Sequence, residues 1–192
     1  MKNVLFTKVL AVVLFCAVFT MGVNAQNVFS KGDNNLNLGV GIGSTLGGSG
    51  YKTTIPPLSI SYERGIIDNL FDDKSSLGIG AYFGYAANKH EWSNSDKAYG
   101  HDYSYLIFGA RGAVHYQLVN NLDTYGGLML GYNVIKAKTY GDWGTFKSEA
   151  AASGLGWSLF LGGRYYFKEN IAAFAELGYG IAYLQLGVSF KF

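Results

Sequence analysis

Four charged residues stand out in this chain of 192 residues because each lies in an apolar or glycine-rich stretch: Glu63, Arg111, Arg164 and Glu176. An unpaired charge in such surroundings is costly, whereas opposite charges that meet there compensate one another. Two of the four are positive and two are negative. We therefore predict that they form a structural network of ion pairs.

Three histidines, His90, His101 and His115, are the other candidates for chemistry. None has the spacing of a zinc site or of the HExxH motif. The sequence HDYS (residues 101–104) brings a histidine near a serine, as a lipid-modifying enzyme would need, but strand alternation would place His101 and Ser104 on opposite faces. We interpret this stretch as a solvated loop, and we predict no catalytic residue, no cofactor-binding residue and no metal ligand.

The first 25 residues have the pattern of a cleaved export signal. Lys2 and Lys8 precede an apolar run at residues 9–19, and the sequence VNA (residues 23–25) supplies small residues before a cleavage point at Gln26. The run is too short for a membrane-spanning helix, which needs about 20 apolar residues. The pattern therefore predicts export from the cytoplasm and not an uncleaved anchor.

Removing this signal changes what the composition implies. Cys16, the only cysteine, lies inside the apolar run after the bulky Phe15, which fits a lipoprotein acceptor poorly. The mature chain would therefore have neither disulfides nor thiolate metal sites. Without the two signal lysines, the 15 Lys and Arg residues fall to 13, equal to the 13 Asp and Glu residues. Such a balance predicts no nucleic-acid partner.

Beyond residue 34, apolar side chains alternate with polar or small ones in eight segments. A period of two is typical of β-strands, because successive side chains point to opposite faces. Six of the segments have 8–13 residues, which suits the roughly 9–11 residues that a tilted strand needs to cross a bilayer. The segments are residues 36–42, 58–63, 77–85, 105–116, 127–134, 155–167, 171–179 and 184–192.

The two faces of these segments distinguish a membrane protein from a soluble one. In the fourth segment, Leu106 and Phe108 share one face, while Arg111 and His115 share the other. A soluble sandwich needs a water-facing polar surface, whereas the polar faces here are rich in glycine and sparsely charged. In a membrane barrel the apolar face meets lipid and the small or polar face fills the lumen. The pattern predicts an all-β fold, an eight-stranded antiparallel transmembrane up-and-down β-barrel.

Glycine is abundant, at 27 residues. The stretch GVGIG (residues 39–43) could be mistaken for a phosphate-binding loop, but no helix is expected after it, so that interpretation fails. Small residues inside a narrow barrel leave room for large side chains from neighbouring strands. The glycines therefore favour a packed lumen.

The links between segments predict the orientation of the barrel. Three long links, at residues 44–55, 86–102 and 136–153, are expected outside the cell, and short turns at residues 120–121 and 168–170 are expected in the periplasm. A further periplasmic link would span residues 65–75. In this orientation we expect Glu63, Arg111, Arg164 and Glu176 to meet in the periplasmic half of the lumen. We divide the chain into a signal peptide (1–25), a short N-terminal segment (26–33) and the barrel (34–192).

From residue 34 to residue 192 the chain resembles the OmpA/OmpX-like family of small outer-membrane β-barrels. Besides the alternating segments, the resemblance is carried by GLGWSLFLGGRYYFKENIAAFAELGYG (residues 154–180) and by the terminal YLQLGVSFKF (residues 183–192). It implies an integral protein of the outer membrane of a Gram-negative bacterium, with outer-membrane lipid and the outer-membrane assembly machinery as partners. It also implies that Phe190 and Phe192 are the assembly signal.

The function expected from these features is non-enzymatic: a structural or surface-interaction role through the extracellular loops, with an extracellular ligand that the sequence does not identify. The alternative is a porin-like channel for small solutes, and a lipid-modifying outer-membrane enzyme ranks third. A barrel of about eight strands has an interior just wide enough for its own side chains, which disfavours a continuous pore.

Overall fold

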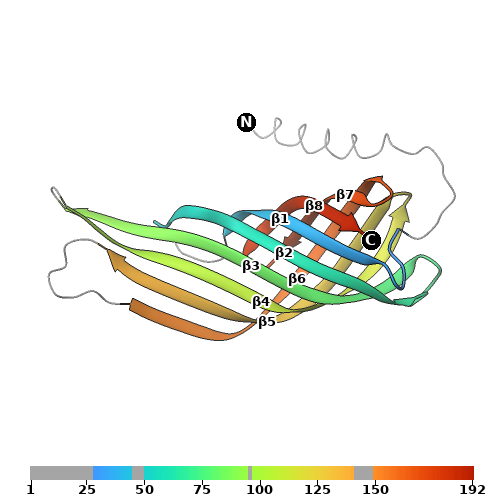
Figure 1. Ribbon diagram of the computed structural model, residues 1–192, viewed down its shortest axis with the longest axis horizontal. Helices are drawn as coiled ribbons and strands as arrows, with labels where there is room; N and C mark the ends of the chain where they lie inside the picture. The colour runs from blue at the N-terminus through green and yellow to red at the C-terminus, as the bar shows by residue number, and fades with distance from the viewer. Residues whose placement is uncertain (1–27, 45–49, 95–96, 141–148) are drawn as a thin grey trace, which may run out of the picture.

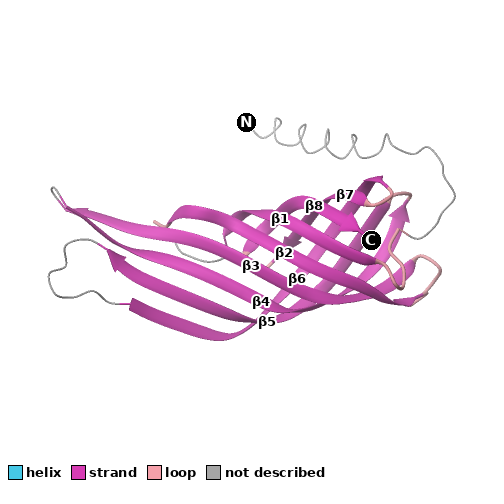
Figure 2. Ribbon diagram, viewed as in Figure 1, coloured by secondary structure: helices cyan, strands magenta, loops and turns pink. Residues whose placement is uncertain are grey.

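A computed structural model describes residues 28–44, 50–94, 97–140 and 149–192. None of these residues belongs to a helix long and apolar enough to cross a membrane. Eight antiparallel strands pair in chain order and close into a barrel when β8 pairs with β1 (Figures 1 and 2). The strands are β1 (Asn34–Ser44), β2 (Lys52–Asp68), β3 (Ser75–Asn94), β4 (Lys97–Val119), β5 (Leu122–Tyr140), β6 (Glu149–Lys168), β7 (Ile171–Gly178) and β8 (Ala182–Lys191). The predicted fold class is confirmed.

Side chains alternate between the outer surface and the lumen as the sequence pattern predicts. In β6, Leu159 and Leu161 are 57% and 65% exposed, whereas Phe160 is buried. Along β4 the apolar outward-facing side chains run from Leu106 to Tyr116. At about 3.3 Å per residue and a tilt of about 40°, this stretch crosses about 25 Å, the height of the apolar band on a membrane barrel.

The first described residues, the C-terminus and three of the links lie at one end of the barrel. There the backbones of Asn34 and Phe192 exchange two hydrogen bonds, of 3.1 and 3.0 Å. The β4–β5 turn contains Asn121 at a φ of 63°, a left-handed conformation that asparagine tolerates better than most residues. Residues 69–74 link β2 to β3, so that link is shorter than the expected 65–75.

Five strands are far longer than the sequence pattern predicts, and four of them, β3 to β6, extend furthest at the other end. β2 to β6 have 17, 20, 23, 19 and 20 residues, whereas β1, β7 and β8 have 11, 8 and 10. Figure 1 shows β3 to β6 continuing as a curved sheet beyond the ends of the shorter strands. The expected long loops at 86–102 and 136–153 were therefore wrong in extent, because most of those residues belong to strands. The expected link at 44–55 was also too long, since residues 52–55 belong to β2. We call residues 86–94, 97–104, 135–140 and 149–153 the protruding sheet.

The outward face of the protruding sheet is charged. Register places Lys89 opposite Asp102 and Asp102 opposite Lys138, so positive and negative positions alternate across three strands. Opposite charges on directly paired positions stabilise a sheet modestly. Such residues belong in water, so the apolar band ends below them.

Candidate functional site: a charge cluster in the lumen

The lumen near the C-terminus contains a buried group of ionisable side chains. Arg164 is fully buried and its guanidinium contacts the carboxylates of Glu63 and Asp123; the Nη1 to Oδ2 distance to Asp123 is 3.0 Å. His115 lies between the same two carboxylates, with Nδ1 2.8 Å from Asp123 and Nε2 2.9 Å from Glu63. These four residues come from β2, β4, β5 and β6, so the group ties half of the strands together.

The contacts of His115 determine its charge. A carboxylate only accepts hydrogen bonds, and both carboxylates are also held by the guanidinium of Arg164. Both ring nitrogens of His115 must therefore donate, which makes the ring an imidazolium. With the neighbouring Arg111 and Glu176, three positive groups then balance three carboxylates, and a buried cluster without net charge avoids the cost of an uncompensated ion.

A second layer of the cluster lies next to the first. Arg111 donates from Nη2 to Oε2 of Glu176 over 2.8 Å, and the hydroxyl of Tyr125 donates to the same oxygen over 3.2 Å. Aromatic rings cover the guanidiniums: Cζ of Arg111 is 3.8 Å from the ring centroid of Phe160, and Cζ of Arg164 is 4.4 Å from that of Tyr125. Cation–π contacts of this kind are strongest where water is excluded.

Glycines make room for the cluster. A Cβ on Gly162 would lie 2.6 Å from the Tyr125 ring, and a Cβ on Gly78 would lie 2.8 Å from Oε1 of Glu63. Both distances are shorter than real side chains tolerate. The prediction that small residues accommodate larger neighbours in the lumen is thus met at these two positions.

The N-terminal segment closes the lumen below the cluster. The ring of Phe29 is only 3% exposed, and its centroid lies 4.1 Å from that of His115. The segment is fixed by its backbone: Val28 N donates to the Gln117 side chain over 2.9 Å, and the Phe29 carbonyl accepts from the Ser76 hydroxyl over 3.0 Å. Residues 28–33 therefore pack against the barrel as part of the folded structure.

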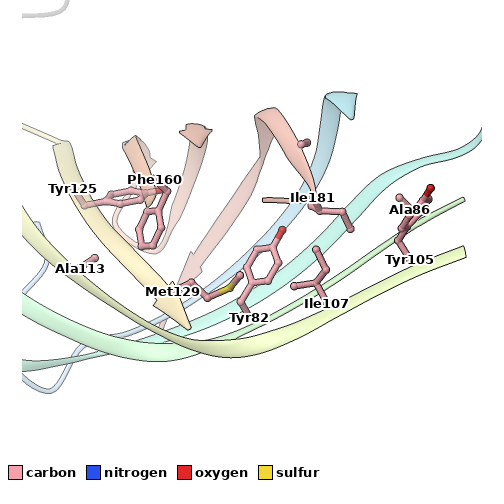
Figure 3. Close-up of a cluster of buried hydrophobic side chains, with 10 residues drawn as sticks. Tyr82, Ala86, Tyr105, Ile107, Ala113, Tyr125, Met129, Phe160 and Ile181 are labelled. Atoms are coloured by element: carbon pink, nitrogen blue, oxygen red, sulfur yellow. The ribbon is translucent and has the colours of Figure 1, made fainter. Parts of the chain in front are cut away.

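An apolar layer lies on the opposite side of the cluster. Figure 3 shows Tyr82, Ile107, Met129 and Ile181 pointing into the lumen from different strands and from the β7–β8 link. Next to this layer is a cavity of about 10 Å³ that Arg111 also lines, which is about the space that one water molecule occupies. The side chains thus leave little room for solute within this part of the lumen.

The structure brings the four predicted charges together as two pairs, Glu63 with Arg164 and Arg111 with Glu176. Sequence reasoning missed three members of the cluster: His115, Asp123 and Tyr125, while Phe29 lay outside the expected strands. The signal that would have found Asp123 and Tyr125 is the alternation of side chains. Positions 123 and 125 continue the inward, odd-numbered face of the fifth segment on the N-terminal side of its expected start at residue 127.

The expected loop positions of two histidines were wrong. His90 lies in β3 and His101 in β4, where they are paired in register. His101 shares the inner face of β4 with Tyr105, and Ser104 is on the outer face, so this histidine and serine cannot form a catalytic pair.

The proposed assembly residues lie at the surface near the chain ends. The side chains of Phe190 and Phe192 are 37% and 71% exposed, and both point outward as the alternation predicts. Their role as an assembly signal stays a prediction.

No protein-family model matches the sequence, and no curated protein matches it. Among solved structures, the chain is similar to that of Ail, the attachment invasion locus protein of Yersinia pestis. In that structure Ail is in complex with the heparin analogue sucrose octasulfate. The TM-score is 0.52 at 14% identity, and the match covers 84% of this chain and 99% of that chain.

Two further solved structures are similar at lower TM-scores. The N-terminal β-barrel domain of OprF from Pseudomonas aeruginosa matches with a TM-score of 0.49 and 16% identity, over 84% of this chain and 98% of that chain. OprG from the same organism matches with a TM-score of 0.48 and 12% identity, over 87% of this chain and 99% of that chain. The match to Ail shows that the chain has the fold of the small outer-membrane barrels, as the resemblance to OmpA and OmpX implies.

Proposed function

We propose that the protein is a non-conducting, non-enzymatic barrel of the outer membrane that presents its protruding sheet for interactions at the cell surface. One observation carries the proposal: side chains fill the lumen from Phe29 to Ile181, while four strands continue beyond the apolar band. The barrel then serves as an anchor, and the sheet beyond it is the part available to partners.

The packed lumen argues against the alternative of a channel. A solute would have to displace Phe29 at one end, pass the ion pairs of Arg164 and Arg111, and then pass the apolar layer around Met129. Each step disrupts buried contacts whose loss costs several kcal/mol by general estimates. A barrel that conducts needs a hydrated path, which these layers do not provide.

The edges of the protruding sheet support an interaction role. Within the described residues, β6 pairs with β7 only from Phe160 onward, so the backbone of residues 149–157 has a free edge. On the opposite side, residues 52–57 of β2 pair with β3 but not with β1. This edge carries Pro56 and Pro57 and register irregularities, which blunt a sheet edge against pairing. The β6 edge has alanine, serine and glycine instead, and an extended peptide could add to it as a further strand.

Surface labelling tests this proposal directly, because Cys16 is the only cysteine and lies in the expected signal. Single cysteines would be introduced by Lys138→Cys in the protruding sheet, Asp72→Cys in the β2–β3 link and Leu130→Cys on the lipid-facing surface. Intact cells would be treated with a membrane-impermeant maleimide, with the unsubstituted protein as control.

We expect Lys138→Cys to be labelled on intact cells and Asp72→Cys only after the outer membrane is permeabilised. Leu130→Cys should react poorly in both cases, since lipid covers it. Labelling of Asp72→Cys but not Lys138→Cys on intact cells would reverse the orientation and refute the display role. Labelling of the unsubstituted protein would show that the signal is retained.

A further inference from the structure

A small cavity lies in the lumen between the charge cluster and the apolar layer. Its volume is about 10 Å³, and its walls come from β3 to β8 and from the β7–β8 link. Figure 3 shows four of its lining side chains, those of Tyr82, Met129, Phe160 and Ile181, in the lumen. Four other lining side chains are polar or charged: Arg111, Ser158, Glu176 and Gln185. A cavity of this size has room for about one water molecule, and polar walls favour a hydrated cavity over a dry one.

One nitrogen of Arg111 lacks an acceptor. The side chain of Arg111 is 2% exposed, and its Nη2 donates to Glu176 over 2.8 Å. Nε of the same guanidinium is buried and donates to no residue in the part of the chain that the structure describes. A guanidinium nitrogen only donates and stays protonated at physiological pH, so a buried Nε–H without an acceptor is costly. An acceptor in the cavity would satisfy it.

Glu176 and Ser158 can bind a further group. The hydrogen bonds that Glu176 accepts from Arg111 and from Tyr125 both end on Oε2. A carboxylate has about four lone-pair sites, so Oε1 can accept as well. The Ser158 hydroxyl is 3.5 Å from the Leu159 carbonyl oxygen, which is long for a hydrogen bond. The walls therefore offer a donor, an acceptor and a hydroxyl that can be either.

The charges around the cavity favour a neutral occupant. Arg111 and Glu176 form an ion pair whose charges cancel. An anion bound to Nε of Arg111 would lie next to the Glu176 carboxylate, and a cation bound to that carboxylate would lie next to the guanidinium. Either ion would leave one uncompensated charge in a buried site. Water adds no charge and can both accept from the guanidinium and donate to the carboxylate.

We propose that this cavity binds one ordered water molecule, which accepts a hydrogen bond from Nε of Arg111 and also bonds to the Glu176 carboxylate and the Ser158 hydroxyl. The water belongs to the charge cluster, since it satisfies the free donor and holds the plane of the guanidinium, whose Cζ is 3.8 Å from the ring centroid of Phe160. Buried waters with about two to four polar partners are costly to remove. Because the apolar layer around Met129 adjoins the cavity, a single water there is no hydrated path.

Nuclear magnetic resonance tests the site through the arginine Nε–H protons. The chain has three arginines, Arg64, Arg111 and Arg164. Refolded, nitrogen-labelled full mature protein in lipid nanodiscs would be studied by water-selective NOE and ROE spectra. Cross-peaks from a bound water change sign relative to the diagonal between the two spectra, whereas cross-peaks from proton exchange do not. Contacts with the rings of Phe160 and Tyr125 distinguish the Arg111 signal from the Arg164 signal.

Arg164 is an internal control. Its Nε is also buried and donates to no described residue, but Arg164 does not line the cavity. Gly180→Ala is designed to fill the cavity, because a Cβ on Gly180 would lie 3.2 Å from Oγ of Ser158, and both residues line the cavity. The matched control is Gly154→Ala, where an added Cβ meets nothing within 4 Å. Heat-modifiable mobility on a gel verifies that each variant is folded.

We expect a bound-water cross-peak at Nε–H of Arg111 and none at Nε–H of Arg164. The Arg111 cross-peak should be lost in Gly180→Ala and kept in Gly154→Ala. Its absence from the wild-type protein, or its persistence in folded Gly180→Ala, would overturn the proposal. Equal cross-peaks at Arg111 and Arg164 would overturn it as well, because water would then permeate the lumen.

Two further outcomes are covered by the same samples. A shift of the Arg111 signal on titration with sodium bromide would overturn the proposal in favour of a bound anion, and we expect no such shift. If Gly180→Ala does not fold, the comparison of Arg111 with Arg164 in the wild-type protein still decides.

Discussion

Replacing Arg164 by alanine is expected to destabilise the barrel more than any other single charge removal. The guanidinium is fully buried and holds two carboxylates, those of Glu63 and Asp123, which are 0% and 2% exposed. Without it, the imidazolium of His115 alone would face both carboxylates, and the cluster would carry one uncompensated negative charge. The contact with the Tyr125 ring would be lost at the same time.

The magnitude follows from the burial of these groups. Removing one partner of a buried ion pair costs about 3–5 kcal/mol, because the other charge stays behind without compensation. Replacing the pair by neutral groups costs much less, and can even be neutral. The double change Arg164→Met with Glu63→Gln should therefore recover a large part of the loss.

Urea unfolding of the protein refolded in lipid vesicles measures this loss. Tryptophan fluorescence reports unfolding, and Trp157, which is 64% exposed on the lipid-facing surface, is one of the three tryptophans that contribute to it. The heat-modifiable mobility of the folded barrel on a gel supplies a second probe. Arg64→Ala is the control, because Arg64 is the next residue after Glu63 and its side chain is on the outer face of the barrel. This substitution should change the free energy of unfolding by less than about 0.5 kcal/mol. A loss below about 1 kcal/mol for Arg164→Ala would refute the reasoning, because it would mean that water solvates these charges.

Three further predictions concern the N-terminal segment, the strand contacts and the chain end. Phe29→Ala should cost about 3 kcal/mol in the same urea assay, because a buried ring is lost at the mouth of the lumen; no change would show that the segment does not seal it. Gly80→Ala should cost about 1–3 kcal/mol, since its Cβ would meet the carbonyl oxygen of Tyr62, whereas Gly112→Ala, with only one atom nearby at 3.9 Å, should cost far less. Deleting Phe192 should lower the amount inserted in cells more than the refolding yield in detergent, and equal losses would favour a packing role over an assembly signal.

Alternation alone predicted the closed barrel and the facing of its strands, because one face must meet lipid and the other must fill a narrow lumen. It failed for the protruding sheet because polar residues occur on both faces there, although side chains such as Ala86 and Asn88 on the inner face are buried. In the stretch from Asn88 to Glu91, polar and charged residues occur on both sides of the strand, so the apolar signal ends while the backbone pairing continues. A length criterion based on the bilayer then ended the strands too early.

The candidate site was predictable where a charged residue occupied an inward-facing position of the alternating pattern, as Glu63 and Arg164 do. Asp123 was missed because it lies between the expected turn at residues 120–121 and the expected start of the fifth segment at residue 127. Phe29 carried no local signal at all, since its burial depends on a segment before the first strand folding back under the barrel. The pairing of His90 with His101 depends on register between two strands, which no spacing motif encodes.

Conductance across a planar lipid bilayer tests the central claim most directly. Refolded mature protein should insert without steady conductance steps, and Phe29→Ala should still not conduct, because the ion pairs and the apolar layer around Met129 continue to block the lumen. Steady, reproducible single-channel steps from the wild-type protein would contradict the account, since they would require a hydrated path through the side chains that fill the barrel.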